Sequence, residues 1–146
     1  MSKAAPIINN RLRHKFDTTK IDLPRESENY AVIFEKNGFG DFHSAKIKFN
    51  SDSILFKCEI DGFTLCEFSI DDLNSFLGYS GNDDDDDGGP NSTSFIGFNN
   101  STKFLNIGFR FPLQFKESIR FLAKADSSST KRECEGYSIL ITEDET

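Results

Sequence analysis

The chain has 146 residues, which is the length of a single domain, and a formal net charge of −7. No apolar run reaches the roughly 18 residues that a membrane-spanning helix needs, and the first residues lack the apolar stretch of a secretory signal. The charge is uneven, because residues 1–25 carry a net +4 and the rest of the chain carries −11. A body this acidic repels phosphate polyanions, which argues against a nucleic-acid or anionic-lipid surface on it.

The basic N-terminal segment, residues 1–28, is predicted to be a flexible arm. It contains Arg11, Arg13 and Lys15, which are the candidate contacts to phosphate or nucleic acid if the chain binds either. A membrane partner is not expected. A single β-rich domain is predicted over residues 29–125.

Strands are predicted from Tyr30 onward, over residues 30–38 and 44–50, where apolar and polar residues alternate. The clearest element is a hairpin over residues 54–69, because Asp61-Gly62 is a strong two-residue turn signal. This turn predicts that Ile60 faces Phe63 and that Cys58 faces Leu65. Cys58 and Cys66 would then point to opposite faces of the hairpin.

A short helix is predicted over residues 69–78, with Ser69 and Asp72 in a capping-box-like start and Gly78 at the end. The acidic segment that follows, residues 79–92, is predicted to be a solvated loop, because a run of like charges beside glycine and proline cannot bury apolar area. Ser80 precedes this run and is a candidate phosphorylation site, since acidophilic kinases favour such a context.

Two further strands are predicted over residues 93–98 and 103–111, followed by an amphipathic helix over residues 112–125. Phe115, Ile119 and Leu122 lie at helical spacing in this segment, and Pro112 would occupy its first turn. Residues 126–146 are predicted to be a serine-rich linker and a C-terminal strand or docking motif.

The order of these elements resembles the pleckstrin-homology (PH) superfold, with residues 103–125 as its last strand and helix. The resemblance implies an α+β, mostly antiparallel fold: a bent barrel or sandwich closed by a C-terminal amphipathic helix. It does not extend to phosphoinositide binding, because the first hairpin has only Lys36 and Lys46 in place of a cluster of bases. An OB-fold, as in small subunits of single-strand-binding complexes, is the alternative.

The C-terminal stretch also resembles a SUMO-interacting motif, in which an extended segment adds a strand to the sheet of a SUMO-like modifier. The residues that carry this resemblance are Ile139, Leu140, Ile141, Glu143, Asp144 and Glu145. The alternative interpretation is that the same residues form a final strand of the domain.

The sequence contains no catalytic motif and no expected metal site or cofactor. Three cysteines without CxxC spacing argue against a disulfide framework or a zinc site and favour a reducing compartment, the cytoplasm or the nucleus. The sequence therefore predicts a non-enzymatic protein-interaction module or small subunit of an intracellular complex. The alternatives are an OB-type subunit that binds single-stranded nucleic acid and a PH-type membrane-recruitment domain.

Overall fold

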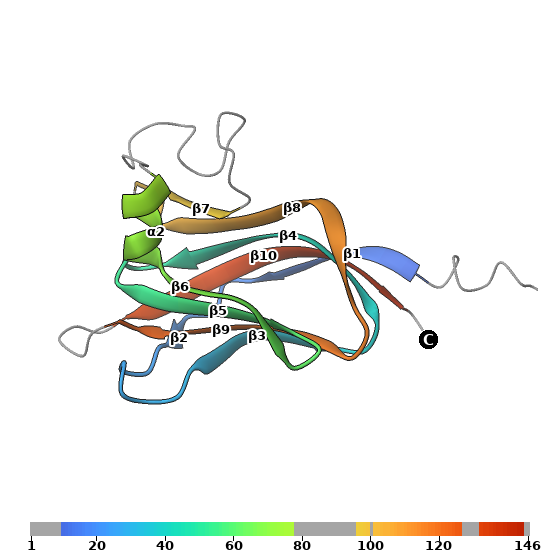
Figure 1. Ribbon diagram of the computed structural model, residues 1–146, viewed down its shortest axis with the longest axis horizontal. Coiled ribbons are helices and arrows are strands. Elements are labelled where there is room, and N and C mark those ends of the chain that lie inside the picture. The colour runs from blue at the N-terminus through green and yellow to red at the C-terminus, as the bar shows by residue number, and fades with distance from the viewer. Residues whose placement is uncertain (1–9, 78–95, 100, 127–131, 145–146) are drawn as a thin grey trace, which may run out of the picture.

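The computed structural model describes residues 10–77, 96–99, 101–126 and 132–144, and most of them lie in antiparallel strands. In chain order the elements are β1 (Asn10–Asp17), β2 (Ile21–Asp22), β3 (Ala31–Asn37), β4 (Gly40–Phe49), β5 (Ile54–Ile60), β6 (Phe63–Ser69), α2 (Ile70–Leu77), β7 (Ile96–Asn99), β8 (Phe104–Phe115), β9 (Ser118–Ala125) and β10 (Glu133–Asp144). Sheet A has the order β1-β10-β4-β8-β7, with β2 also paired to β10, and sheet B has the order β3-β9-β5-β6. Figure 1 shows the two sheets packed face to face, with α2 at one end.

The strand pairs are nested along the chain. The first strand pairs with the last (β1 with β10), and inside that pair lie β3 with β9, β4 with β8, and β5 with β6. This pattern arises when one long antiparallel hairpin rolls up. Its successive strand pairs then lie alternately in sheet A and sheet B. The pairs β4–β10 and β5–β9 join the layers of the roll. This arrangement is a jelly roll, an all-β sandwich.

The predicted C-terminal helix is wrong, and with it the PH-like barrel that such a helix would close. Residues 112–125 form the end of β8, a turn at 116–117 and the strand β9. The segment carries two periods at once, because Ile119, Phe121 and Ala123 also alternate and are all buried in the core. Pro112 is tolerated in β8 because it lies where the pairing with β4 shifts register. The α+β class is therefore corrected to an all-β sandwich with one short helix, and the OB alternative, which needs the same terminal helix, falls as well.

Both chain ends belong to the sandwich. Residues 10–17, expected within the flexible arm 1–28, form β1 and pair with β10 along its length. Residues 133–144 form β10, which lies between β1 and β4. Gly136 allows the close approach of β10 to the end of β1, because its φ is +145° and a Cβ there would lie 2.5 Å from the carbonyl oxygen of Asp17. The domain therefore extends well beyond the predicted range 29–125.

The predicted hairpin and the predicted short helix are confirmed. Asp61 and Gly62 both have positive φ, as a two-residue hairpin turn of this kind requires, and Ile60 faces Phe63. The main-chain N–H of Asp72 donates to Ser69 Oγ at the start of α2. The acidic segment 79–92, with Ser80, lies outside the described residues.

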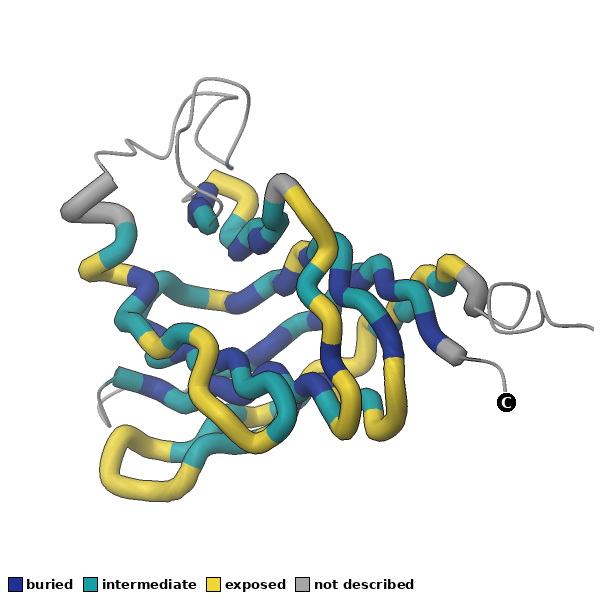
Figure 2. Tube along the Cα trace, turned by 45° about the vertical axis from the view of Figure 1, so that its right-hand side comes forward, coloured by how far each residue is buried: buried dark blue, intermediate teal, exposed yellow. Residues whose placement is uncertain are grey.

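Phenylalanine side chains fill the space between the sheets. The fully buried ones are Phe42, Phe49, Phe56, Phe98, Phe115 and Phe121. The ring of Phe121 lies 5.4–5.8 Å from those of Phe34, Phe42 and Phe56, which come from three other strands in both sheets. Buried residues alternate with partly exposed ones along the strands, and many of the exposed residues lie in the turns (Figure 2). None of the helices in the described part of the chain is long and apolar enough to cross a membrane.

Candidate functional site

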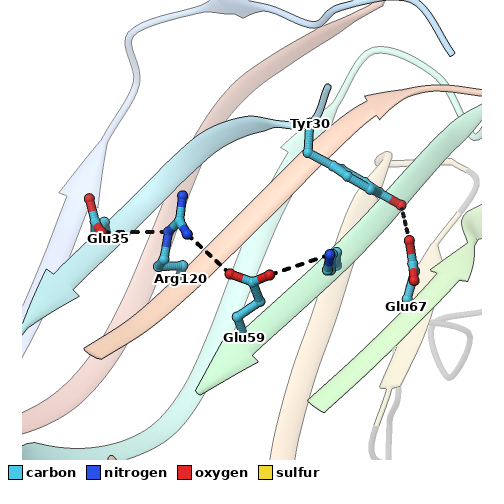
Figure 3. A network of polar contacts seen from close by, with 6 residues as sticks. Tyr30, Glu35, Glu59, Glu67 and Arg120 are labelled. Atoms are coloured by element: carbon cyan, nitrogen blue, oxygen red, sulfur yellow. Dashed lines mark hydrogen bonds and ion pairs between the residues drawn. The ribbon is translucent and has the colours of Figure 1, made fainter. Parts of the chain in front are cut away.

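The outward face of sheet B carries a row of alternating charges (Figure 3). Arg120 on β9 contacts Glu35 on β3 at 3.5 Å and Glu59 on β5 at 3.2 Å. Lys57 contacts the other oxygen of Glu59 at 3.3 Å. Each of these groups is at least partly in solvent, where a single ion pair contributes less than about 1 kcal/mol. The row gives this face a set of partly exposed charges that are paired with one another.

Tyr30 completes the same face. Its hydroxyl donates to Glu67 at 2.7 Å, and its ring receives the ammonium groups of Lys57 and Lys124 at 5.4 and 4.8 Å from the centroid. Burial and the neighbouring Glu67 carboxylate raise the pKa of Tyr30 above its ordinary value of 10. The phenol therefore stays protonated and acts as a hydrogen-bond donor between strands.

A second ionic cluster lies on the inward face of β10, near the edge of sheet A that β1 forms. Glu143 on β10 is only 7% exposed, and three cations surround its carboxylate. Lys15 Nζ lies at 2.9 Å, Lys36 Nζ at 3.0 Å and Arg13 Nε at 3.7 Å. Arg13 and Lys15 belong to sheet A and Lys36 to sheet B, so one carboxylate ties the two sheets together. Charges that point inward from an edge strand also oppose pairing of that edge with another chain.

The protonation of Glu143 follows from these contacts. Burial would raise the pKa of its carboxyl, but hydrogen bonds and Coulomb attraction from Lys15 and Lys36 outweigh burial and hold the pKa below its ordinary 4.5. The folded state therefore gains stability from this group above about pH 4.5 and loses it as the pH falls through the lowered folded value. Arg13 and Lys15, predicted as phosphate or nucleic-acid contacts, are placed against this carboxylate, and the side chain of Arg11 lies outside the described ones.

We expect Glu143→Gln to destabilise the protein by about 1–3 kcal/mol, because the amide leaves three cations around a neutral, nearly buried group. The matched control is Glu135→Gln, which removes one partly exposed carboxylate of β10 that lies 3.7 Å from the ammonium group of Lys48. That control should cost less than about 1 kcal/mol. Urea unfolding at pH 7 measures both, and equal effects would mean that the cluster does not hold the sheets together.

The structure places the proposed docking motif in the core. Ile139 and Ile141 are 0% exposed and point inward from β10, which is paired on both edges. Leu140 points outward beside His14 of β1. Neither edge of β10 nor its inward isoleucines are open to a modifier, so the alternative interpretation, a final strand of the domain, is the one that the structure shows. The side chain of Asp144 and the whole of Glu145 lie outside the described part of the chain.

Both histidines make hydrogen bonds to hydroxyl groups of β10. His14 Nε2 lies 2.5 Å from Ser138 Oγ, and His43 Nε2 lies 2.6 Å from Thr142 Oγ1. Within residues 10–77, 96–99, 101–126 and 132–144, no three His, Cys, Asp or Glu side chains are grouped so that they could hold a metal ion.

Three turns are tied together at the end of the sandwich seen at the lower right of Figure 1. The carboxylate of Asp61, in the β5–β6 turn, accepts main-chain N–H groups of Lys116, Glu117 and Ser118 in the β8–β9 turn at 2.6–3.1 Å. The N–H of Gly38, in the β3–β4 turn, donates to Glu117 O at 2.8 Å. These bonds, that of Glu117 above all, lower the pKa of Asp61 below its ordinary 3.8. We call this region the turn end.

We expect Asp61→Asn to lower the melting temperature at pH 7, because the amide keeps the turn shape but cannot accept three N–H groups as a carboxylate does. Since the folded pKa lies below 3.8, the contribution of Asp61 is present above that pH and is lost as the pH falls through the folded value. The gap in melting temperature between wild type and variant should therefore close toward pH 2. Asp41→Asn removes one carboxylate from β4 without touching these turns and serves as the control. A gap that does not change with pH would contradict the assignment.

Three phenylalanine side chains at or near the turn end are exposed to solvent. Phe39 is 42% exposed and follows Gly38, and Phe63 is 78% exposed and follows the Asp61-Gly62 turn. Phe111 is 74% exposed and lies between Gly108, opposite Ser44, and Leu113, opposite Phe42, in the part of β8 that leads into the third turn. Leu12 and Leu65 are further exposed apolar residues. Large apolar side chains exposed at or near hydrogen-bonded turns are typical of an interaction surface.

Sequence patterns alone did not single out these phenylalanines. A signal existed, because Phe39 and Phe63 each directly follow a turn glycine, where polar residues are usual, and Phe111 directly precedes Pro112. Their gathering at one end depends on which turns the jelly roll brings together, and only the pairing of distant strands shows it.

No protein-family model and no curated protein matches the chain. Among solved structures, the chain is similar to the crystal structure of the infectious bursal disease virus VP2 subviral particle, with a TM-score of 0.45 and 9% sequence identity. The match covers 93% of this chain and 33% of that one, so the chain spans about one third of the length of the viral protein.

Proposed function

We propose that this chain is a non-enzymatic protein-interaction module, a small subunit of an intracellular complex, and that it binds an apolar surface of its protein partner through the turn end. The single observation that carries the proposal is the exposure of three phenylalanines at one set of hydrogen-bonded turns: Phe39 and Phe63 directly follow two of the turns, and Phe111 lies on the part of β8 that leads into the third. Aromatic side chains provide much of the binding energy at protein interfaces, and they do so best when the free protein already holds them in place.

The chemistry of the turn end favours a protein partner. The carboxylate of Asp61 is already occupied by main-chain donors, and Lys36 is paired with Glu143. A surface with exposed aromatic rings suits an interface that binds by burial of apolar area, with weak dependence on salt. All three cysteines are free thiols, which fits the reducing interior of a cell.

The test compares what three immobilised forms of the full chain capture from the source cell, measured by quantitative mass spectrometry. The double variant Phe63→Ser with Phe111→Ser should lose at least tenfold of a specific partner protein relative to wild type. The matched control is Phe16→Ser, because Phe16 is 67% exposed but lies on β1, away from the three turns. It should retain the partner. All three forms should have similar melting temperatures, since exposed side chains contribute little to folding.

Two outcomes would overturn the proposal. Equal capture by wild type and by the double variant would show that the turn end is not the interface. Loss of capture after nuclease treatment, or steeply with rising salt, would show that nucleic acid is the partner instead.

A further inference from the structure

Cys58 and Cys66 face each other across the hairpin, contrary to the prediction that they point to opposite faces. They are direct Cα partners in the antiparallel pair β5–β6, and a register shift lies between Cys58 and Glu59. This β-bulge moves the far part of β6 by one residue, so that Cys66 in place of Leu65 lies opposite Cys58. Both side chains therefore share the inward face of sheet B.

The spacing of directly opposed residues suits a disulfide. Their Cα atoms lie about 4.5–5.5 Å apart in antiparallel sheets, within the roughly 4.4–6.8 Å that disulfides span. Both thiols are free in this structure. The interaction between the two side chains is the largest influence on the pKa of each thiol. The register therefore places the two cysteines at a spacing that a disulfide can span.

The two thiols are not equivalent. Cys66 is half-buried on β6, the edge strand of sheet B, whereas Cys58 is 2% exposed on the inner strand β5. The interaction with Cys58 lowers the pKa of Cys66, and the same interaction together with burial raises the pKa of Cys58. Cys66 is therefore the thiol that an oxidant meets first, and Cys58 is the one placed to react with the product.

We propose that Cys58 and Cys66 form a reversible intramolecular disulfide when the protein meets a hydroperoxide. The Cys66 thiolate attacks the terminal peroxide oxygen, the O–O bond breaks, and Cys66 becomes a sulfenic acid while the leaving alkoxide or hydroxide takes a proton. Cys58 then attacks the sulfenic sulfur, the S–O bond breaks, and the displaced hydroxide leaves as water with the Cys58 proton. The two thiols supply the two electrons that reduce the peroxide. This proposal does not depend on the proposed function.

Cys134 is an internal control. It is fully buried on β10, and burial raises the pKa of its thiol to about 11. It should remain a thiol under conditions that oxidise the pair.

The experiment treats the reduced, folded full chain with hydrogen peroxide and measures intact mass, followed by digestion after glutamate residues. We expect a loss of two hydrogens, and cleavage at Glu59 and Glu67 should leave Cys58 and Cys66 in separate peptides joined by a disulfide. Dithiothreitol should reverse the change. Cys134→Ser should behave as wild type, and Cys66→Ser, which alters the less buried partner, should give no intramolecular disulfide. Cys58→Ala tests the buried partner without adding a polar group.

Each other outcome contradicts the proposal. A gain of oxygen on Cys66 without a link to Cys58 would show that Cys58 is not within reach. A disulfide that includes Cys134, or one between two chains, would show that the pair is not the reactive unit. No change at a peroxide concentration that oxidises an exposed thiol standard would show that the pair is closed to oxidants.

Discussion

Removal of residues 136–146 is expected to abolish cooperative folding. The deletion takes away most of β10, which lies between β1 and β4, so β1 loses its partner strand and β4 loses one of its two. It also removes Ile139 and Ile141, each of which contributes about 1.5–3 kcal/mol by burial. Together with the lost main-chain hydrogen bonds, the lost stabilisation should be comparable to the whole free energy of unfolding of a domain, roughly 5–15 kcal/mol. Thermal unfolding followed by far-UV circular dichroism should show no sharp transition.

A full-length variant separates side-chain burial from strand pairing. Ile139→Ala with Ile141→Ala keeps every main-chain group of β10, and each substitution should cost about 2–5 kcal/mol. If these residues formed an exposed docking segment, neither the deletion nor the double variant would alter the melting temperature. A truncated chain that still unfolds cooperatively at the wild-type temperature would therefore return β10 to the docking interpretation.

The sequence predicted best those elements whose signals are local. The Asp61-Gly62 turn and the helix that starts after Ser69 each depend on a few neighbouring residues, and both are confirmed. Segment 112–125 was predicted wrongly as a helix, because its apolar residues fit both the helical period and the strand period. Only the partners β3 and β5 on either side of β9 decide between them. The sequence does not show these partners, which come from residues about 60–90 positions away.

A single bulge explains the misplaced cysteines. The predicted register was correct at the turn, where Ile60 faces Phe63, and failed after Glu59 because one strand carries an extra residue there. Side chains alternate with a period of two, so a shift of one residue exchanges the two faces. No glycine or other local signal marks this position, so the shift could not be predicted from the sequence. For the same reason the sequence did not predict that Cys58 and Cys66 face each other.

The candidate site could be predicted only in part for a related reason. Arg13 and Lys15 are visible as bases in a basic segment, and Glu143 as an acid near the end of the chain, but nothing local indicates that they meet. The pairing of the first strand with the last brings them together, and this converts a candidate phosphate contact into a partly buried ionic contact within sheet A. Charge counted along a sequence therefore says little about which charges remain available to a partner.

Phe121→Ala is expected to be the most costly single substitution in the core. The ring is fully buried on β9, and it contacts Phe34, Phe42 and Phe56, so its loss leaves a cavity between the two sheets. Removal of a buried phenylalanine costs about 3–5 kcal/mol, which lowers the melting temperature of a chain of this size by roughly 10–20 °C. Phe63→Ala is the matched control, because its side chain is 78% exposed and its loss should change stability by less than about 0.5 kcal/mol. If urea unfolding gave similar values for both variants, Phe121 would not lie in a packed core, and the face-to-face packing of the two sheets would be wrong.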